Sequence, residues 1–144
     1  MNKIILGGDH SKNKMEKIVF GAGFLGKRIA EKLNYAIVGR EVDPLNLKNL
    51  QIFLDREKPS IVVNAIGKTG RPNIDWCETH KEETFQSNVT VPINLSTECS
   101  KRGIYFVHIG SGCIYSGYPE AGFTEEDKPN FYGPQFYAKT KIIS

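Results

Sequence analysis

Three side chains near the end of the chain are of the types that move protons at a carbonyl group. Tyr137 and Lys141 are four residues apart, so they share one face of a helix. A phenol can donate or remove a proton, and a nearby ammonium favours the phenolate over the neutral phenol. The hydroxyl of Ser111 can polarise a substrate oxygen. This combination suits hydride-transfer chemistry at a carbonyl carbon.

The segments around these residues make the prediction specific, because a tyrosine and a lysine at this spacing often occur by chance. An apolar strand is expected over residues 104–109, and it is broken by Gly110-Ser111-Gly112-Cys113. A polar linker follows, and then the sequence FYGPQFYAKTK. The end of the strand would present Ser111, and the helix after the linker would present the tyrosine and the lysine.

A glycine-rich turn near the start of the chain predicts a dinucleotide-binding site. Residues 17–20 are typical of a buried strand, GAGFLG follows, and Leu25, Ile29 and Leu33 then recur at helical spacing. Strand, G-x-G-x-x-G and helix together form the dinucleotide fingerprint in its required context. The glycines would allow a tight turn, approach of the pyrophosphate and close packing of helix on strand. The cofactor-binding residues expected here are Gly21, Gly23, Phe24, Leu25 and Gly26.

The second and third strands should bring further residues to the cofactor. Residues 35–38 are expected to form a strand that ends at Arg40, which favours a 2′-phosphate and therefore NADP(H) over NAD(H). Glu41 leaves a solvated charge pair as the alternative. Asp43 either reaches the adenine or caps the next helix, predicted from Leu45 to about Glu57 with Leu47, Leu50 and Leu54 as its core stripe. The third strand is expected over residues 61–67, and its end, from Asn64 through Ala65 and Ile66 to Gly67, should run beside the cofactor.

The middle of the chain predicts a loop and a long helix. In the loop KTGRPNI, Arg71 either holds a substrate phosphate or is an exposed charge, and Trp76 is expected to pack. A helix is predicted from Glu78 to Arg102, with a bend or break near Pro92. Asn88 is unfavourable inside a helix, so a specific role is expected for its amide. The amide is expected to orient a water molecule or a backbone group near Lys141, and Asn88 is counted among the cofactor-binding residues. Structural roles are expected for His80 and His108, and Cys77 and Cys99 are expected to be ordinary buried or helix-face cysteines.

Composition favours one soluble domain. The chain has 144 residues, of which 40% are hydrophobic and 24% charged. The three cysteines are widely spaced, which indicates neither a zinc site nor a disulfide framework and favours a reducing cytoplasm. A net charge of +3 does not indicate nucleic acid, and no apolar run approaches the roughly 20 residues that span a membrane. No metal site is predicted.

The order of these elements predicts an α/β fold, a Rossmann-like parallel sheet of order 3-2-1-4 with flanking helices. Residues 1–14 are expected to be a detached or disordered leader, and Met15 to begin the domain. Residues 15–144 would form the N-terminal part of an NAD(P)-binding domain. The chain ends three residues after Lys141, so we expect it to be truncated after the start of the active-site helix, without a C-terminal substrate domain.

From Met15 onward the sequence resembles the extended short-chain dehydrogenases that act on nucleotide sugars. The resemblance is carried by GAGFLG, VVNAIG, Asn88-Val89, HIGSGCIYSG and the spacing of Tyr137 and Lys141. Within that group it is most similar to the dTDP/UDP-4-keto-6-deoxy-glucose 3,5-epimerase/4-reductases of rhamnose synthesis, through GRPNIDWCETHKEET, SGCIY and FTEEDKPNFYG. Plain 4-dehydrorhamnose reductases and GDP-fucose synthases are close relatives.

The resemblance implies roles for four residues. Ser111, Tyr137 and Lys141 match the reductase triad, and Cys113 matches the cysteine that exchanges protons beside the keto group in epimerase-reductases. A small apolar residue behind the triad is the alternative for Cys113. Ser111 and Cys113 would also contact the substrate, a dTDP- or UDP-linked sugar.

The resemblance also frames the alternatives. Besides NADP(H), the cofactor that Arg40 favours, NAD(H) stays the alternative, and a homodimer stays open. The second acid/base group of the epimerase would lie beyond Ser144. The alternatives are a plain 4-ketoreductase, a GDP-fucose synthase, and a non-catalytic regulatory subunit that binds NADP.

Overall fold

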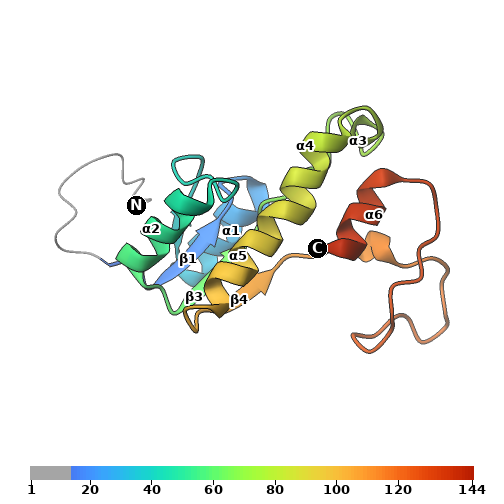
Figure 1. The fold of residues 1–144 in the computed structure, drawn as a ribbon. Helices are drawn as coiled ribbons and strands as arrows, with labels where there is room; N and C mark the ends of the chain where they lie inside the picture. The colour runs from blue at the N-terminus through green and yellow to red at the C-terminus, as the bar shows by residue number, and fades with distance from the viewer. Residues whose placement is uncertain (1–13) are drawn as a thin grey trace. The chain divides into compact units, whose positions relative to one another are not determined.

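The computed structural model describes residues 14–144, which form two compact units (Figure 1). The first consists of the described residues up to Ile66 together with Val91–Ile109, and the second of Gly67–Thr90 together with Gly110–Ser144. Residues 1–13, nearly all of the expected leader, lie outside the described part.

A four-stranded parallel sheet forms the centre of the first unit. Its strands are β1 (Lys17–Phe20), β2 (Ala36–Val38), β3 (Ile61–Asn64) and β4 (Tyr105–His108). They are ordered β2-β1-β3-β4, with Val19 opposite both Ile37 and Val63. The Rossmann-like parallel sheet expected from the sequence is therefore confirmed, and its carboxyl ends lie along one edge, where α/β proteins build their sites.

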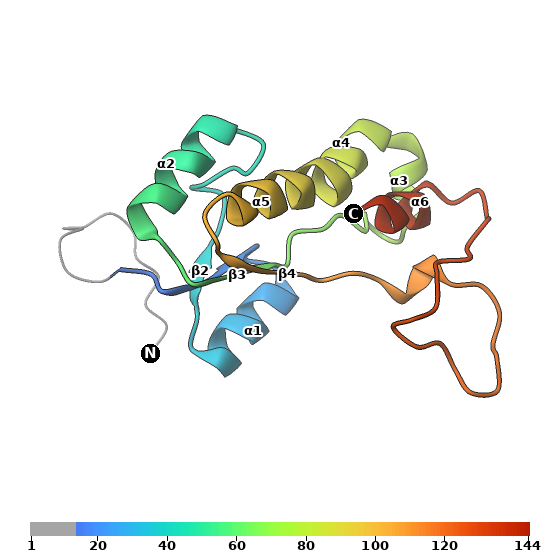
Figure 2. The same cartoon turned by 60° about the horizontal axis from the view of Figure 1, so that its bottom comes forward.

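The predicted strand order, 3-2-1-4, is wrong. It placed the third strand outside the second, whereas β3 pairs with β1 and lies between β1 and β4. Residues 39–46 form turns and no strand, and after α2 the chain has crossed back over β1 to pair with its other edge. Right-handed crossovers in opposite directions require helices on opposite faces, and Figure 2 shows α1 (Phe24–Leu33) and α2 (Leu47–Glu57) placed in this way.

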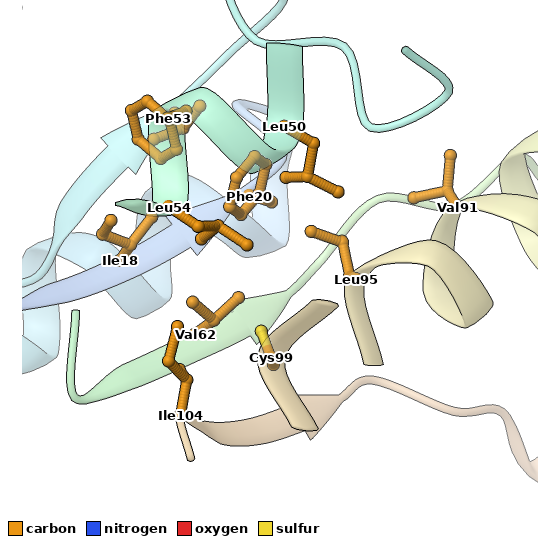
Figure 3. Packing of buried hydrophobic residues seen from close by; sticks show 11 residues of the cluster. Ile18, Phe20, Leu50, Phe53, Leu54, Val62, Val91, Leu95, Cys99 and Ile104 are labelled. Carbon is orange, nitrogen blue, oxygen red and sulfur yellow. The ribbon is translucent and has the colours of Figure 1, made fainter. Parts of the chain in front are cut away.

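The core of the first unit lies between the sheet and the helices α2 and α5 (Val91–Ser100). Figure 3 shows side chains of β1 and β3 meeting those of both helices. Leu50 and Leu54 are fully buried, as the helical spacing predicts, and Phe53 joins them with its ring edge on Phe20 at 5.8 Å between centroids. Leu47 is 45% exposed, so its assignment to the core stripe is wrong.

On the opposite face, α1 packs closely at a glycine, against the residues that follow β1 and β3, and not at its leucines. Gly26 is its only buried residue, whereas Leu25 and Leu33 are exposed. The recurrence of Leu25, Ile29 and Leu33 therefore identified the helix correctly but not a buried face. The close approach of the backbone at Gly26 determines which side of the helix is covered.

An ion-pair network joins the ends of α2 and α5. Arg102 donates hydrogen bonds to Glu98 at 2.6 Å and to Asp55 at 2.7 Å, and Lys101 donates to Glu98 at 2.7 Å. Glu98 is buried, and hydrogen bonds from Lys101 and Arg102 lower its pKa from 4.5 to about 2. The pKa of Arg102 is raised by the two carboxylates.

The second unit contains three helices and two tight helical turns. The helices are α3 (Trp76–Thr79), α4 (Lys81–Phe85) and α6 (Phe136–Ile143), and the turns are a π-helical turn at Gln86–Thr90 and a 3-10 turn at Gly112–Ile114. The helix predicted over 78–102, with a bend or break near Pro92, is interrupted at His80 and distorted at 86–90. Pro92 itself lies inside α5, and the distortion comes before it because a proline cannot donate to the carbonyl four residues earlier, that of Asn88.

Candidate active site

The glycine-rich turn of the first unit has the geometry that its sequence predicts. Gly21 has a φ of +105°, and its N–H donates to the carbonyl of Val38 at 2.9 Å. A Cβ at this position would lie 2.9 Å from the carbonyl carbon of Ala65 and from the nitrogen of Ile66. Only glycine combines this backbone angle with this contact.

The other two glycines of the turn have different roles. A Cβ on Gly26 would lie 1.8 Å from the carbonyl oxygen of Gly21, so Gly26 is needed for packing. Gly23, in contrast, has no neighbouring atom within 4 Å of such a Cβ and forms the N-cap of α1 without a side-chain cap. Phe24, the first residue of α1, is 80% exposed. The start of α1 thus offers backbone N–H groups and the positive end of a helix dipole at an open surface, which suits an anion.

The residues after β2 are arranged by local hydrogen bonds. Glu41 accepts a hydrogen bond from the N–H of Gly39 at 2.7 Å, while Arg40 is exposed. Asp43 accepts from the N–H of Leu45 at 2.9 Å and does not cap the next helix, so that alternative is wrong. The N-cap of α2 is Asn46, which accepts from Asn49 at 3.1 Å.

The end of β3 is held by a buried asparagine, Asn64, the first residue of the stretch 64–67 that was expected beside the cofactor. Asn64 is fully buried and accepts from the N–H of Ile66 at 3.0 Å. Its amide nitrogen lies 3.0 Å from Nδ1 of His108 at the end of β4. His108 therefore has the structural role expected of it. Ala65 donates to Phe20 at 2.9 Å, which fixes the chain that follows β3 beside the glycine-rich turn.

In the second unit, α6 carries the tyrosine and the lysine. Tyr137 and Lys141 are one turn apart and buried, 7% and 8% exposed. Burial lowers the pKa of Lys141, because the protein solvates its ammonium less well than water does. A Cβ on Gly67 would lie 3.8 Å from Nζ of Lys141 and 3.7 Å from Oδ1 of Asn88. Gly67, Asn88 and Lys141, all predicted from the sequence, thus lie together.

Asn88 connects two segments of this unit. It is fully buried in the π-helical turn, and its Oδ1 accepts from the N–H of Lys68 at 2.7 Å. Its Nδ2 donates to the carbonyl of Lys68 at 3.0 Å and to Oγ1 of Thr140 at 3.1 Å. Its polar atoms orient backbone, as predicted. Thr140 was not predicted to be part of the site. Its position in the sequence between Tyr137 and Lys141 could have indicated that it lies close to them.

The 3-10 turn that carries Ser111 and Cys113 packs against α6. Ser111 is the N-cap of this turn, and its hydroxyl accepts from the N–H of Cys113 at 3.2 Å. Cys113 is a free, exposed thiol. The linker returns to the turn, since Asn130 and Phe131 both donate to the carbonyl of Ile114 at 3.1 Å. These bonds close the loop between the serine and the helix of the tyrosine.

The loop before α3 leaves Arg71 exposed. Trp76 is half-buried and stacks on His80 with 3.7 Å between ring centroids, so it packs as expected. Nζ of Lys68 lies 4.8 Å from the centre of the tryptophan ring.

The remaining chemistry-bearing groups indicate no further centre. Cys77 and Cys99 are buried free thiols, as predicted. Among residues 14–144, no group of three or more His, Cys, Asp or Glu side chains is placed to hold a metal ion. Over the same residues, no helix is both long enough and apolar enough to cross a membrane.

Comparison with known proteins extends these observations. The family described as RmlD substrate binding domain matches residues 15–143. A bifunctional dTDP-4-dehydrorhamnose 3,5-epimerase/dTDP-4-dehydrorhamnose reductase of Arabidopsis thaliana is 48% identical over 62% of this chain. A trifunctional UDP-glucose 4,6-dehydratase/UDP-4-keto-6-deoxy-D-glucose 3,5-epimerase/UDP-4-keto-L-rhamnose-reductase of the same plant is 37% identical over 94%. The chain spans 32% and 22% of the lengths of these two relatives.

Solved structures agree with the sequence relatives. A UDP-rhamnose synthase from Acanthamoeba polyphaga mimivirus superposes with a TM-score of 0.75 at 29% identity, covering 90% of this chain and 50% of its own. A dTDP-4-dehydrorhamnose reductase from Clostridium acetobutylicum gives a TM-score of 0.75 at 25% identity, with 90% and 47% coverage.

Proposed function

Because the chain belongs to the RmlD substrate binding domain family, we propose that the protein is an NADP(H)-dependent epimerase/reductase of a nucleotide-4-keto-6-deoxy-hexose in rhamnose-type sugar synthesis. The observation that carries the proposal is the burial of Tyr137 and Lys141 on one helix, against the turn that bears Ser111 and Cys113. The names of the Arabidopsis relatives, both epimerases and reductases of such sugars, support the substrate class.

Residues 15–144 are proposed to form the dinucleotide-binding domain. The glycine-rich turn fits a pyrophosphate, since Gly23 leaves open space at the N-terminus of α1 and Gly21 and Gly26 cannot carry a side chain. The exposed Arg40 suits a 2′-phosphate and so NADP(H), with NAD(H) as the second choice. The other residues proposed to contact the cofactor are Phe24, Leu25, Asp43, Ala65, Ile66, Gly67, Asn88, Tyr137 and Lys141.

The reduction assigns a task to each polar group. NADPH, when bound, supplies the hydride for the ketone carbon C4. The phenol of Tyr137 donates the proton to the ketone oxygen, and the ammonium of Lys141 stabilises the phenolate that is left. Ser111 donates a hydrogen bond to the same oxygen and so stabilises the charge that develops there.

Epimerisation requires proton exchange before reduction. The C4 ketone acidifies the hydrogens on C3 and C5, and a thiolate can remove a proton and its thiol can return it. Cys113 is exposed and is therefore accessible to a sugar, as this role demands. We propose Arg71, exposed in its loop, for the phosphates of the nucleotide sugar.

A plain 4-ketoreductase is the second candidate, and the structural similarity to a dTDP-4-dehydrorhamnose reductase favours it. Such an enzyme needs the serine, tyrosine and lysine but not Cys113. A regulatory subunit that only binds NADP needs none of the four residues.

One experiment separates these functions. The full-length protein is incubated with NADPH and a dTDP- or UDP-4-keto-6-deoxy-glucose in deuterated water, and the sugar is followed by NMR. Deuterium at C3 and C5 in a rhamnose product is expected. Reduction without that exchange indicates the plain ketoreductase, and absence of turnover with both substrates contradicts both enzymes.

Two variants test the residue roles in the same assay. Tyr137→Phe should abolish reduction while NADPH binding persists, and full residual turnover would refute the assignment. Cys113→Ser should suppress the exchange at C3 and C5 more than hydride transfer. Equal loss of both would indicate that Cys113 is structural.

A further inference from the structure

The hydroxyl of Thr140 lies at the centre of a buried hydrogen-bond network. Thr140 is 1% exposed and lies on α6 between Tyr137 and Lys141. Its Oγ1 donates to the carbonyl of Tyr137 at 2.6 Å and accepts from Nδ2 of Asn88 at 3.1 Å. One hydroxyl therefore joins the tyrosine's own helical turn to the π-helical turn at 86–90.

This arrangement fixes the orientation of the Asn88 amide. A hydroxyl has a single proton, and Thr140 uses it on the carbonyl of Tyr137, so it can only accept from Asn88. Nδ2 of Asn88 therefore faces Thr140. The backbone of Lys68 requires the same orientation, because its N–H can only donate to Oδ1, as observed at 2.7 Å, and its carbonyl can only accept from Nδ2. A flipped amide would leave buried donors and acceptors unpaired, which is costly.

The same amide lies beside the lysine. Oδ1 of Asn88 and Nζ of Lys141 approach the same side of Gly67, 3.7 Å and 3.8 Å from where its Cβ would be. The backbone of Lys68 is bonded to both ends of the amide. A change at Thr140 is thus expected to move residues 67–68 relative to the ammonium of Lys141.

We propose that Thr140 is a positioning residue of the reaction, acting through Asn88 to hold residues 67–68 and the Tyr137–Lys141 turn of α6 in one arrangement. This inference rests on the proposed reductase function. Thr140 contacts no reacting atom in this role. The hydroxyl is the group that acts in this proposal, because it makes both hydrogen bonds, to the carbonyl of Tyr137 and from Asn88.

The test compares Thr140→Val, which keeps the shape and removes the hydroxyl, with Thr140→Ser, which keeps the hydroxyl. Thr140→Ala is measured in parallel, because it removes the hydroxyl without a second methyl group that could prevent folding. Two properties of the full-length protein are followed: hydrogen exchange of the Lys68 backbone amide, and the kcat, KM and pH profile of NADPH-dependent reduction of the 4-keto sugar nucleotide.

In the valine and alanine variants, exchange at Lys68 should rise and kcat should fall, each roughly tenfold or more, with a displaced pH profile, because a buried donor loses its acceptor. The KM for NADPH should stay within about threefold of wild type. Thr140→Ser should restore all of these values to within about threefold.

Three outcomes would overturn the proposal. Unchanged exchange at Lys68 without the hydroxyl would refute the coupling through Asn88. Equal damage in Thr140→Ser and Thr140→Val would show that packing of the methyl group matters and not the hydroxyl. Absence of turnover in the wild-type protein would refute the reductase function, and with it Thr140's role in that reaction, whereas the exchange measurement still reports on the coupling.

Discussion

Glu78 accepts a hydrogen bond from the backbone N–H of Phe136 at 2.6 Å, across 58 residues of sequence. Phe136 is the first residue of α6, whose N-cap, Gln135, makes no side-chain cap. A carboxylate from α3 therefore occupies the place of a local cap, where it also interacts favourably with the positive end of the helix dipole. The helix of Tyr137 and Lys141 is thus anchored at its start by Glu78 and in its middle by Asn88.

Replacing Glu78 by alanine should loosen the start of α6. The expected cost is about 1 kcal/mol of unfolding free energy, typical of a lost helix cap, together with faster hydrogen exchange at Phe136. Glu78→Gln is the matched control, since it keeps an oxygen acceptor and removes the charge, and it should lose less. Equal exchange at Phe136 in wild type and Glu78→Ala would show that the bond does not hold the helix.

Two alanine substitutions in the glycine-rich turn should give opposite results. Gly26→Ala places a methyl group 1.8 Å from the carbonyl oxygen of Gly21, so it should lower the unfolding free energy by roughly 1–3 kcal/mol or more. Gly23→Ala meets no atom within 4 Å and has an ordinary backbone angle, φ of −76°, so it should leave stability nearly unchanged.

The matched measurement for this pair is NADPH affinity. The added methyl group of Gly23→Ala would occupy the space proposed for the pyrophosphate, and affinity should fall at least tenfold while the thermal unfolding curve stays in place. Wild-type affinity in Gly23→Ala would contradict the proposed cofactor site.

Glu98 should make the protein sensitive to acid. Its pKa is about 2 in the folded protein against 4.5 ordinarily, so the unfolded state binds the proton more tightly. The stabilisation is then complete above about pH 5 and is lost as the pH falls toward 2. The amount is on the order of 1–3 kcal/mol, because water reaches the partners Lys101 and Arg102.

Urea unfolding between pH 7 and pH 2 measures this contribution. Glu98→Gln should be less stable than wild type at pH 7 and should show a flatter dependence on pH. Asp55→Asn removes the exposed partner of Arg102. In this variant the unfolding free energy should keep most of its wild-type dependence on pH. If the unfolding free energy of Glu98→Gln depended on pH as strongly as that of the wild type, Glu98 would not be the source of the acid sensitivity.

The three thiols should differ in reactivity. Cys113 is exposed, whereas Cys77 and Cys99 are fully buried and burial raises the pKa of Cys99 to about 11. Iodoacetamide at mildly alkaline pH should therefore modify one cysteine of the native protein rapidly and the other two only after unfolding, as followed by mass spectrometry. Cys113→Ser should abolish the rapid phase, and rapid labelling of Cys99 would contradict its burial.

Local patterns predicted most of the elements. The strand at 17–20, the glycine-rich turn and the helix of Tyr137 and Lys141 were found correctly, because each depends on spacing within a few residues. Strand order was predicted wrongly, because it depends on whether the third strand pairs with β1 or with β2, and no local pattern specifies that choice. The exposure of Leu25 and Leu33 was missed for a similar reason, since the contact at Gly26 sets the face of α1.

The sequence by itself determined the residue types that can bind a dinucleotide and transfer a proton, and the strands and helices that carry them, since these follow from local periodicity and from glycine's backbone freedom. Only the tertiary structure decided that Asn88 donates a hydrogen bond to Thr140, that Glu78 caps α6 and that Glu98 is buried between two cations. The first two are hydrogen bonds across 52 and 58 residues. No local pattern encodes such bonds, because their geometry exists only after distant segments have packed together.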